Sequence, residues 1–212
     1  MDHDVIIYGV GGMAREVYEL SFCGGDTSCI GNMVGYFSDL GVAPDFEAQT
    51  GLSFIDLPVA MARYPSLHVL LCIGDPVARK SVAQKINDLG AKLHTFVHPS
   101  AVVARSAQIG AGTVVYPFAM VSCNVKISEG CVINCYTALG HDVEIGSFCT
   151  ISAQVDLTGH VKLGEGVFIG SGARVVPKKK IGAYSKISAG ITVIRSLKAH
   201  SVVLPKPTRT EG

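Results

Sequence analysis

The dominant pattern in this chain is an aliphatic residue at every sixth position from Val97 to Val193. Seventeen consecutive positions in this phase are Ile, Leu or Val, without a slip. A period of six is neither the 3.6 of a helix nor the simple alternation of a strand. It is the signature of a parallel β-helix of hexapeptide repeats, in which each coil stacks on the coil below. The positions are Val97, Val103, Ile109, Val115, Val121, Ile127, Ile133, Leu139, Ile145, Ile151, Leu157, Leu163, Ile169, Val175, Ile181, Ile187 and Val193.

The hexads resemble the left-handed β-helix of the hexapeptide acyltransferases, in which three hexads form one triangular coil of 18 residues. Left-handed crossovers are an exception to the usual handedness of parallel connections, and the period alone does not give the hand. In such a prism the aliphatic side chains point inward, where neighbouring coils lie about 4.8 Å apart. Glycine and small residues near the aliphatic positions suit the tight corners.

Residues 1–96 follow a different pattern, in which short apolar runs alternate with amphipathic helical stretches. This alternation predicts a small α/β domain with a parallel sheet and flanking helices. We expect strands at Asp4–Gly9, Met33–Phe37, Leu52–Ile55, His68–Ile73 and Lys92–Val97. We expect helices with Met13, Val17 and Leu20 on one face, from Pro58, and after Asp75 with Ala78, Val82, Ile86 and Leu89 on one face.

The predicted organisation is therefore an α/β domain at residues 1–96, a β-helix at 97–196 and a C-terminal tail at 197–212.

Charge is uneven along this chain, although its formal net charge is only +1. From Arg174 to the end there are nine Lys or Arg and one acid, whereas the preceding residues hold nine bases and 16 acids. This clustering suggests an anionic ligand. Nucleic acid is disfavoured as the partner because aromatic residues are not interleaved and no binding motif is present.

Neither a signal peptide nor an apolar run of the ~18–20 residues needed to cross a membrane is found, so no membrane partner is expected. The seven cysteines are odd in number and form no CxxC pair, which disfavours disulfide and zinc frameworks. Cys131 and Cys149 are 18 residues apart, so in a triangular coil they should stack as small buried thiols. We expect a protein of the reducing cytoplasm.

The glycine-rich loop after the first strand is the chemical candidate of the N-terminal half. Gly9, Gly11, Gly12 and Ala14 form a GxGGxA pattern that leads into a helix. Glycines let backbone N–H groups approach a phosphate at a helix N-terminus. We favour a nucleotide or nucleotide-sugar phosphate, with a structural turn and NAD as alternatives. A dinucleotide is disfavoured because residues 1–96 provide only one mononucleotide-binding half.

The candidate catalytic residue of the prism is His141, in the stretch CYTALGHDVEIGS. His141 follows the inward Leu139 by two places and should face outward, with Asp142 beside it to orient the ring. Gly159 lies 18 residues later and should stack over His141. A basic imidazole beside a backbone N–H donor is what acyl transfer from a thioester requires. The alternative is an ordinary surface histidine. His160, on the next coil but off the stacking line of His141, is expected to contribute little.

Six motifs cover nearly the whole chain in order: IIYGVGGMAREV, GYFSD, LCIGDPVAR, FVHPSAVV, VINCYTALGHDVEIGSF and VFIGSGARVVP. As a set they resemble the bacterial sugar acetyltransferases, which join a small Rossmann-like domain to a left-handed β-helix. Members N-acetylate nucleotide-linked amino sugars or O-acetylate sialic acid. The resemblance implies an acetyl-CoA-dependent enzyme without a metal, assembled as a homotrimer, with acetyl-CoA in the groove between adjacent prisms.

The resemblance also assigns roles to residues. It makes His141 the general base, Asp142 its acidic neighbour and Asn134 a residue near the acceptor group. Gly159 matches the glycine whose N–H meets the thioester carbonyl. Substrate binding falls to the loop glycines Gly9, Gly11 and Gly12 and to Asp39. The candidates for binding CoA are Ser171, Gly172, Ala173, Arg174, Lys178, Lys179, Lys186, Arg195 and Lys198. Among them, the Lys and Arg side chains are expected to bind the phosphates of CoA.

Three departures from the family pattern concern the acceptor. Met13 stands where some members carry a histidine in the glycine loop, and Thr150 replaces a second histidine nine places after the catalytic one. The run Lys178-Lys179-Lys180 replaces a more apolar turn.

Competing functions remain open at this stage. We favour the amino group of a nucleotide-linked amino sugar as the acetyl acceptor, with a sugar hydroxyl as the alternative, since both reactions use the same base. A zinc-dependent β-helix carbonic anhydrase is disfavoured because His98, His141, His160 and His200 include no pair of suitable spacing. A non-catalytic scaffold or ligand-binding protein would keep the hexads without needing the arrangement at His141.

Overall fold

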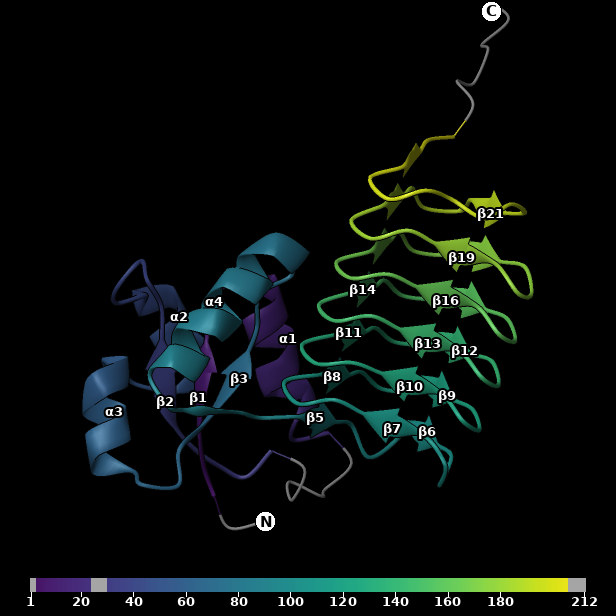
Figure 1. Cartoon of the computed structure of the whole chain (residues 1–212). Coiled ribbons are helices and arrows are strands. Elements are labelled where there is room, and N and C mark those ends of the chain that lie inside the picture. The colour runs from purple at the N-terminus through teal and green to yellow at the C-terminus, as the bar shows by residue number, and fades with distance from the viewer. Residues whose placement is uncertain (1–2, 24–29, 206–212) are drawn as a thin grey trace, which may run out of the picture.

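The structure is a computed structural model that describes residues 3–23 and 30–205. A small N-terminal α/β region lies beside a long parallel β-helix (Figure 1). Four parallel strands of the α/β region form one sheet in the order β2-β1-β3-β4. The elements of this region are β1 (Asp4–Tyr8), α1 (Gly12–Leu20), β2 (Asn32–Phe37), α2 (Pro44–Thr50), α3 (Leu57–Arg63), β3 (His68–Leu71), α4 (Pro76–Asp88) and β4 (Lys92–Leu93).

The β-helix is a three-sided prism of two-residue strands, and each side is one parallel sheet. The seven-stranded sheet contains β5 (Phe96–Val97), β8 (Val114–Val115), β11 (Val132–Ile133), β14 (Thr150–Ile151), β17 (Phe168–Ile169), β20 (Lys186–Ile187) and β22 (Val202–Val203). The six-stranded sheet contains β6 (Val102–Val103), β9 (Met120–Val121), β12 (Ala138–Leu139), β15 (Asp156–Leu157), β18 (Arg174–Val175) and β21 (Thr192–Val193). The five-stranded sheet contains β7 (Gln108–Ile109), β10 (Lys126–Ile127), β13 (Glu144–Ile145), β16 (Lys162–Leu163) and β19 (Lys180–Ile181).

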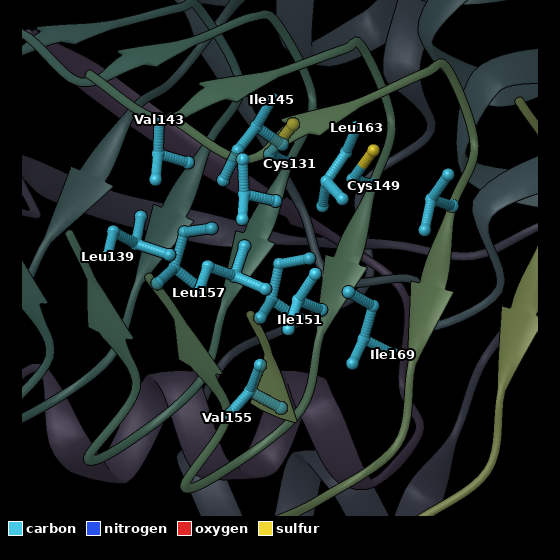
Figure 2. Close-up of a cluster of buried hydrophobic side chains, with 14 of the residues drawn as sticks. Cys131, Leu139, Val143, Ile145, Cys149, Ile151, Val155, Leu157, Leu163 and Ile169 are labelled. Carbon is cyan, nitrogen blue, oxygen red and sulfur yellow. The ribbon is translucent and has the colours of Figure 1, made fainter. Parts of the chain in front are cut away.

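The hexad prediction is confirmed, because the aliphatic positions fill the interior of the prism. Val115 and all later members of the series are buried, and the first three pack against them. Leu139 and Leu157 lie in register on adjacent strands, 18 residues apart, and point into the same core (Figure 2). Cys131 and Cys149 are both buried, as expected, and face this core. Each fully buried aliphatic side chain of this interior contributes about 1.5–3 kcal/mol to burial.

The three sides of the prism differ in what they present outward. The seven-stranded sheet is covered by the α/β region, and Phe96, Val114 and Val132 are buried there with β1 and α1. The five-stranded sheet presents mainly charge, with Lys162 in register with Glu144 and bound to it at 2.8 Å. The six-stranded sheet presents exposed apolar residues in its first coils, described below. Only this last side is both apolar and uncovered by the described chain.

The α/β region corrects three predictions about its elements. The strand expected at Leu52–Ile55 is only a single bridge between Tyr36 and Phe54. The short helix α2 was not expected, because its seven residues show no apolar period. Lys92–Val97 is two strands, since β4 pairs with β3 and β5 pairs with β8 of the prism. The chain thus passes from one sheet to the other within this segment.

Helix α4 buries a face that is shifted from the predicted one, with Ile86 common to both and Val82 packed at the edge of the core. Ala78 and Leu89 are exposed, and the buried residues are Pro76, Arg79, Ala83 and Ile86. The face is rotated because the charged side chain of Arg79 points inward, where it is fully buried between the two parts of the molecule. An apolar pattern does not reveal a buried arginine, so the sequence predicted only part of the buried face.

The segment expected as a tail from residue 197 begins with further pairing to the prism. Leu197 bridges to Ile181, and β22 continues the seven-stranded sheet beyond β20. Residues 206–212 of that segment lie outside the described part of the chain. Within residues 3–23 and 30–205, no helix is long and apolar enough to cross a membrane.

Candidate active site

His141 lies in the corner between β12 of the six-stranded sheet and β13 of the five-stranded sheet. The corner is held by stacking, since the Asp142 N–H donates to the Cys123 carbonyl one coil below at 3.0 Å. Asp142 has a left-handed backbone, with φ of 59°. The imidazole Nδ1 is 2.8 Å from Asp142 Oδ2, and the His141 side chain is 56% exposed. The base is therefore oriented by a carboxylate and open to a ligand.

Gly159 stacks over His141 as predicted from the 18-residue spacing. A Cβ atom at this position would lie only 2.5 Å from His141 Nε2. Any side chain would therefore displace the ring, which explains glycine here. The Gly159 N–H has no hydrogen-bond acceptor among the described residues, whereas its carbonyl accepts from the Lys178 N–H at 3.0 Å. An unengaged N–H beside the free ring nitrogen is the arrangement expected of an oxyanion donor.

Asp142 is the centre of a small polar network. Its hydrogen bond with His141, and then the one from Asn124 Nδ2 at 3.1 Å, lower the pKa of the Asp142 carboxyl. An ionised carboxylate is the partner that an imidazolium needs.

His160 lies off the stacking line of His141, as predicted, but it still belongs to this corner. It is 18 residues after Asp142 and stacks on that residue. Its Nε2 is 3.8 Å from Asp142 Oδ2, and its ring lies edge-on to His141 with centroids 4.9 Å apart. The sequence already indicated this contact, because 18 residues, the length of one coil, separate Asp142 from His160 just as they separate His141 from Gly159. The expectation that no two histidines are suitably spaced was therefore wrong.

Asn134 is not brought to His141 within one chain. It follows β11 and lies in the corner between the seven- and six-stranded sheets, at the opposite edge of the six-stranded sheet from His141. There it lines a cavity of about 580 Å³ between α1 and the prism. Most of this lining is apolar or aromatic. The other lining residues are Arg15, Glu16, Glu19, Leu20, Tyr116, Pro117, Phe118, Cys135 and Tyr136.

The glycine loop contains glycines of two kinds. Gly9 is required by the backbone, because its φ is +121° and a Cβ would lie 2.8 Å from the Cys72 carbonyl oxygen. At Gly11 and Gly12 a Cβ would meet nothing within 4 Å. The fold does not need these two glycines, and the space in front of them is free. Beside them, Val10 and Arg15 line a second cavity of about 250 Å³ with the start of α2.

Asp39 is engaged within the protein. Its carboxylate forms an ion pair with Lys85 of α4 at 2.7 Å and accepts a hydrogen bond from the Tyr8 hydroxyl. These two partners, Lys85 first, lower the pKa of Asp39. Asp39 does not line the cavity beside the glycine loop. Its assignment to substrate binding stays a prediction.

The residues predicted to bind CoA fall on different parts of the prism. Lys178 and Lys179 share the corner of Gly159, between β18 and β19. Ser171, Gly172 and the buried Ala173 lie between β17 and β18, at the opposite edge of the six-stranded sheet. The remaining candidates are Arg174 in β18, Lys186 in β20, and Arg195 and Lys198 after β21. No single surface of one chain gathers them all.

Two of the three departures from the family pattern have structural explanations. Thr150 is buried on the covered sheet, where its hydroxyl binds Arg79 at 2.9 Å and the Gly74 carbonyl at 3.1 Å. It serves the contact between the two parts of the molecule. Met13 packs against the apolar cluster around α1.

Comparison with solved structures yields matches over nearly the whole chain. PerB from Caulobacter crescentus, with CoA and GDP-perosamine, is 30% identical with a TM-score of 0.82, covering 94% of this chain and 92% of that one. A histidine-to-asparagine variant of perosamine N-acetyltransferase from the same organism is 28% identical with a TM-score of 0.84, covering 99% and 97%. The acetyltransferase domain of PglB from Neisseria gonorrhoeae FA1090, with acetyl coenzyme A, is 25% identical with a TM-score of 0.80, covering 94% of each chain.

No protein-family model and no curated protein sequence matches the chain. The β-helix with a histidine–carboxylate pair at its corner defines an acyltransferase of the hexapeptide-repeat class. By its identity to PerB and the extent of that match, the chain belongs to the sugar acetyltransferases of this superfamily.

Proposed function

We propose that this protein transfers the acetyl group of acetyl-CoA to the amino group of a nucleotide-linked amino sugar. The observation that carries the proposal is the triad of His141, Asp142 and Gly159 at one solvent-exposed corner. The relatives support the substrate class, since PerB is solved with CoA and GDP-perosamine. O-acetylation of a sugar hydroxyl is the second candidate, because the same base serves both reactions. A non-catalytic scaffold is disfavoured, because it would have no use for an oriented base.

In the proposed mechanism His141 Nε2 takes a proton from the acceptor nitrogen as that atom attacks the thioester carbon. A new C–N bond forms, the C–S bond breaks, and the sulfur of CoA leaves with the electron pair. The Gly159 N–H donates to the oxyanion of the tetrahedral intermediate. Asp142 stabilises the imidazolium and holds the ring at 2.8 Å. Because stacked strands fix both Gly159 and His141, the site needs no mobile loop.

The test of this function is a transfer assay with the purified protein. Acetyl-CoA is combined with nucleotide-linked 4-amino and 3-amino sugars, their hydroxyl counterparts and sialic acid, and thiol release is followed. We expect turnover with an amino sugar and an amide product by mass spectrometry. An ester product would establish O-acetylation instead. Absence of thiol release with every acceptor would favour the scaffold.

We further propose that residues 1–96 form a Rossmann-like domain whose glycine loop binds the acceptor. Residues 97–196 form a left-handed β-helix that carries out the acyl transfer, and residues 197–212 form a tail. The free space at Gly11 and Gly12 supports a phosphate beside the start of α1, which has no acidic residue in its first turn. The basic residues near Gly159, Lys178 and Lys179, are suited to CoA phosphates. We keep the expectation of a cytoplasmic protein.

Gly11→Val tests the acceptor site without disturbing the fold. Since a Cβ at Gly11 meets nothing within 4 Å and the residue has an extended backbone with φ of −79°, valine is accommodated in the free protein. We expect at least a tenfold weaker affinity for the nucleotide sugar by calorimetry, with acetyl-CoA binding and thermal stability unchanged. Weakened acetyl-CoA binding with intact acceptor binding would reverse the assignment of the two sites.

We propose a homotrimer in which the six-stranded sheet lies at the contact between prisms. Its first coils expose Val102, 67% accessible, and Met120, 46% accessible. At the adjoining corner the exposed rings of Phe118 and Tyr136 stack with centroids 5.1 Å apart. His141 and Asn134 lie at opposite edges of this sheet. When neighbouring prisms pack against the sheet, the base at one edge can therefore meet the acceptor cavity at the edge of another chain. Acetyl-CoA would then lie in the groove between prisms.

Met120→Glu is expected to produce a monomer, because it places a charge in the centre of this apolar surface. Analytical ultracentrifugation at micromolar concentration should show a threefold fall in mass, together with loss of most turnover. Gln108→Glu, at the equivalent outward position of the five-stranded sheet, is the matched control and should stay trimeric. A trimer that survives Met120→Glu, or a monomeric wild type, would refute this interface.

A further inference from the structure

The corner that holds the base also gathers three potential metal ligands. One donor atom from each of His141, Asp142 and His160 can be chosen so that all three lie within 4.8 Å of one another. Asp142 Oδ2 is central, 2.8 Å from His141 Nδ1 and 3.8 Å from His160 Nε2. Two imidazole nitrogens and a carboxylate oxygen are donors typical of zinc and of its spectroscopic substitute cobalt.

The backbone holds this set in place while leaving the side chains free to adjust. Asp142 and His160 both adopt left-handed conformations, with φ of 59° and 61°, so equivalent positions of adjacent coils project their side chains from the same corner. The His160 N–H donates to the His141 carbonyl at 3.0 Å. The side chains are 56%, 37% and 48% exposed for His141, Asp142 and His160. Donors around a tetrahedral zinc lie about 3.3 Å apart, at metal–nitrogen distances near 2.0 Å, so small rotations bring these atoms to that separation.

The second shell of the cluster also fits a metal. Asn124 donates to the other oxygen of Asp142 at 3.1 Å, which orients the carboxylate as outer-shell partners of metal ligands do. Three protein ligands leave a fourth position for water. Solvent reaches the cluster directly, so no entry path has to open.

We propose that His141, Asp142 and His160 form a binding site for a divalent transition-metal ion of the zinc type, and that the ion inhibits the enzyme. Metal binding stands on the geometry alone, whereas inhibition rests on the proposed role of His141. A bound ion takes a lone pair of His141 and engages the carboxylate that orients its ring. It thereby withdraws the proton acceptor and also places a positive charge where the acceptor amine must approach.

The site is tested first by binding, without reference to activity. Metal-free protein is titrated with Zn²⁺ by calorimetry and with Co²⁺ by visible absorption, which reports nitrogen and oxygen ligands around cobalt. We expect one ion per chain in the wild type and at least a tenfold weaker affinity in His160→Ala. The matched control is His200→Ala, an exposed corner histidine that also has a left-handed backbone, with φ of 59°, and stacks on Tyr184. It should bind as the wild type does. Equal affinity in His160→Ala and the wild type, or no binding in either, would overturn the site.

The inhibition is tested by initial rates with and without Zn²⁺, followed by a chelator. We expect reversible loss of turnover in the wild type and in His200→Ala, and at least a tenfold higher zinc concentration for half-inhibition in His160→Ala. Zinc that binds at this site without slowing the reaction would leave the metal site standing and refute His141 as the base. Equal inhibition of His160→Ala and the wild type would place the inhibitory ion elsewhere and overturn the proposal.

Discussion

Replacing His141 by alanine is expected to lower kcat at least about a hundredfold while both Michaelis constants stay near wild type. A positioned base typically contributes 10²–10⁴-fold, and its effect is confined to the transition state in which the proton moves. The ring is held by Asp142 at 2.8 Å and has Gly159 directly above it, so its loss removes the ring nitrogen that lies beside the oxyanion donor. Steady-state kinetics with acetyl-CoA and an accepted amino sugar measure the effect.

Two further variants make this result interpretable. Asp142→Asn should cost less than His141→Ala, because the ring loses its charged partner but keeps its nitrogen. His200→Ala removes an exposed histidine from another corner and should leave kcat unchanged. If His141→Ala keeps most of the wild-type turnover, His141 is an ordinary surface histidine and another residue must supply the base.

The second large effect concerns stability and the fully buried Arg79. Its guanidinium donates to the carbonyls of Gly130, Phe148 and Cys149 in the prism at 2.6, 3.0 and 3.1 Å. It also donates to the carbonyls of Ile73 and Gly74 after β3, at 2.7 and 3.0 Å. No carboxylate pairs with it among the described residues. One side chain therefore ties the α/β region to the β-helix through backbone oxygens.

Arg79→Ala is expected to lower the free energy of unfolding by about 3–5 kcal/mol. The substitution leaves a cavity and several buried carbonyls without a donor, each costing about 1–3 kcal/mol when unsatisfied. Chemical denaturation at a fixed protein concentration measures the change, since the stability of the proposed trimer would depend on concentration. Arg63→Ala, on the exposed end of α3, should change stability by less than about 0.5 kcal/mol. If Arg79→Ala lowers the free energy of unfolding by less than about 1 kcal/mol, Arg79 does not contribute much to holding the α/β region against the β-helix.

The sequence predicted the prism well because one residue in six carries the whole structural signal. The same register predicted that Gly159 stacks on His141, and it also places His160 on Asp142, next to His141. The α/β region was harder to predict. Helix α2 is short and aperiodic, and the interior role of Arg79 depends on carbonyls more than 50 residues away in the chain.

The placement of the basic residues was less predictable for a physical reason. They were assigned from their clustering toward the C-terminal end, which does not say at which edge of a sheet each residue lies. The coil topology puts Asn134 and His141 at opposite edges of one sheet, and the contacts between chains that would bring them together are not encoded in the spacing of hexads.

The register of the prism limits how the gene for this protein can change in length. Consecutive strands lie on successive sides, so a deletion of one hexad moves every later strand to the side of its predecessor. Removing a hexad between β11 and β14 would place Asp156, of β15, where Thr150 now meets Arg79. Removing 18 residues returns each strand to its own side. Tolerated insertions and deletions should therefore be whole coils. They should fall outside the coils that the α/β region covers and outside the coils that hold His141 and Gly159.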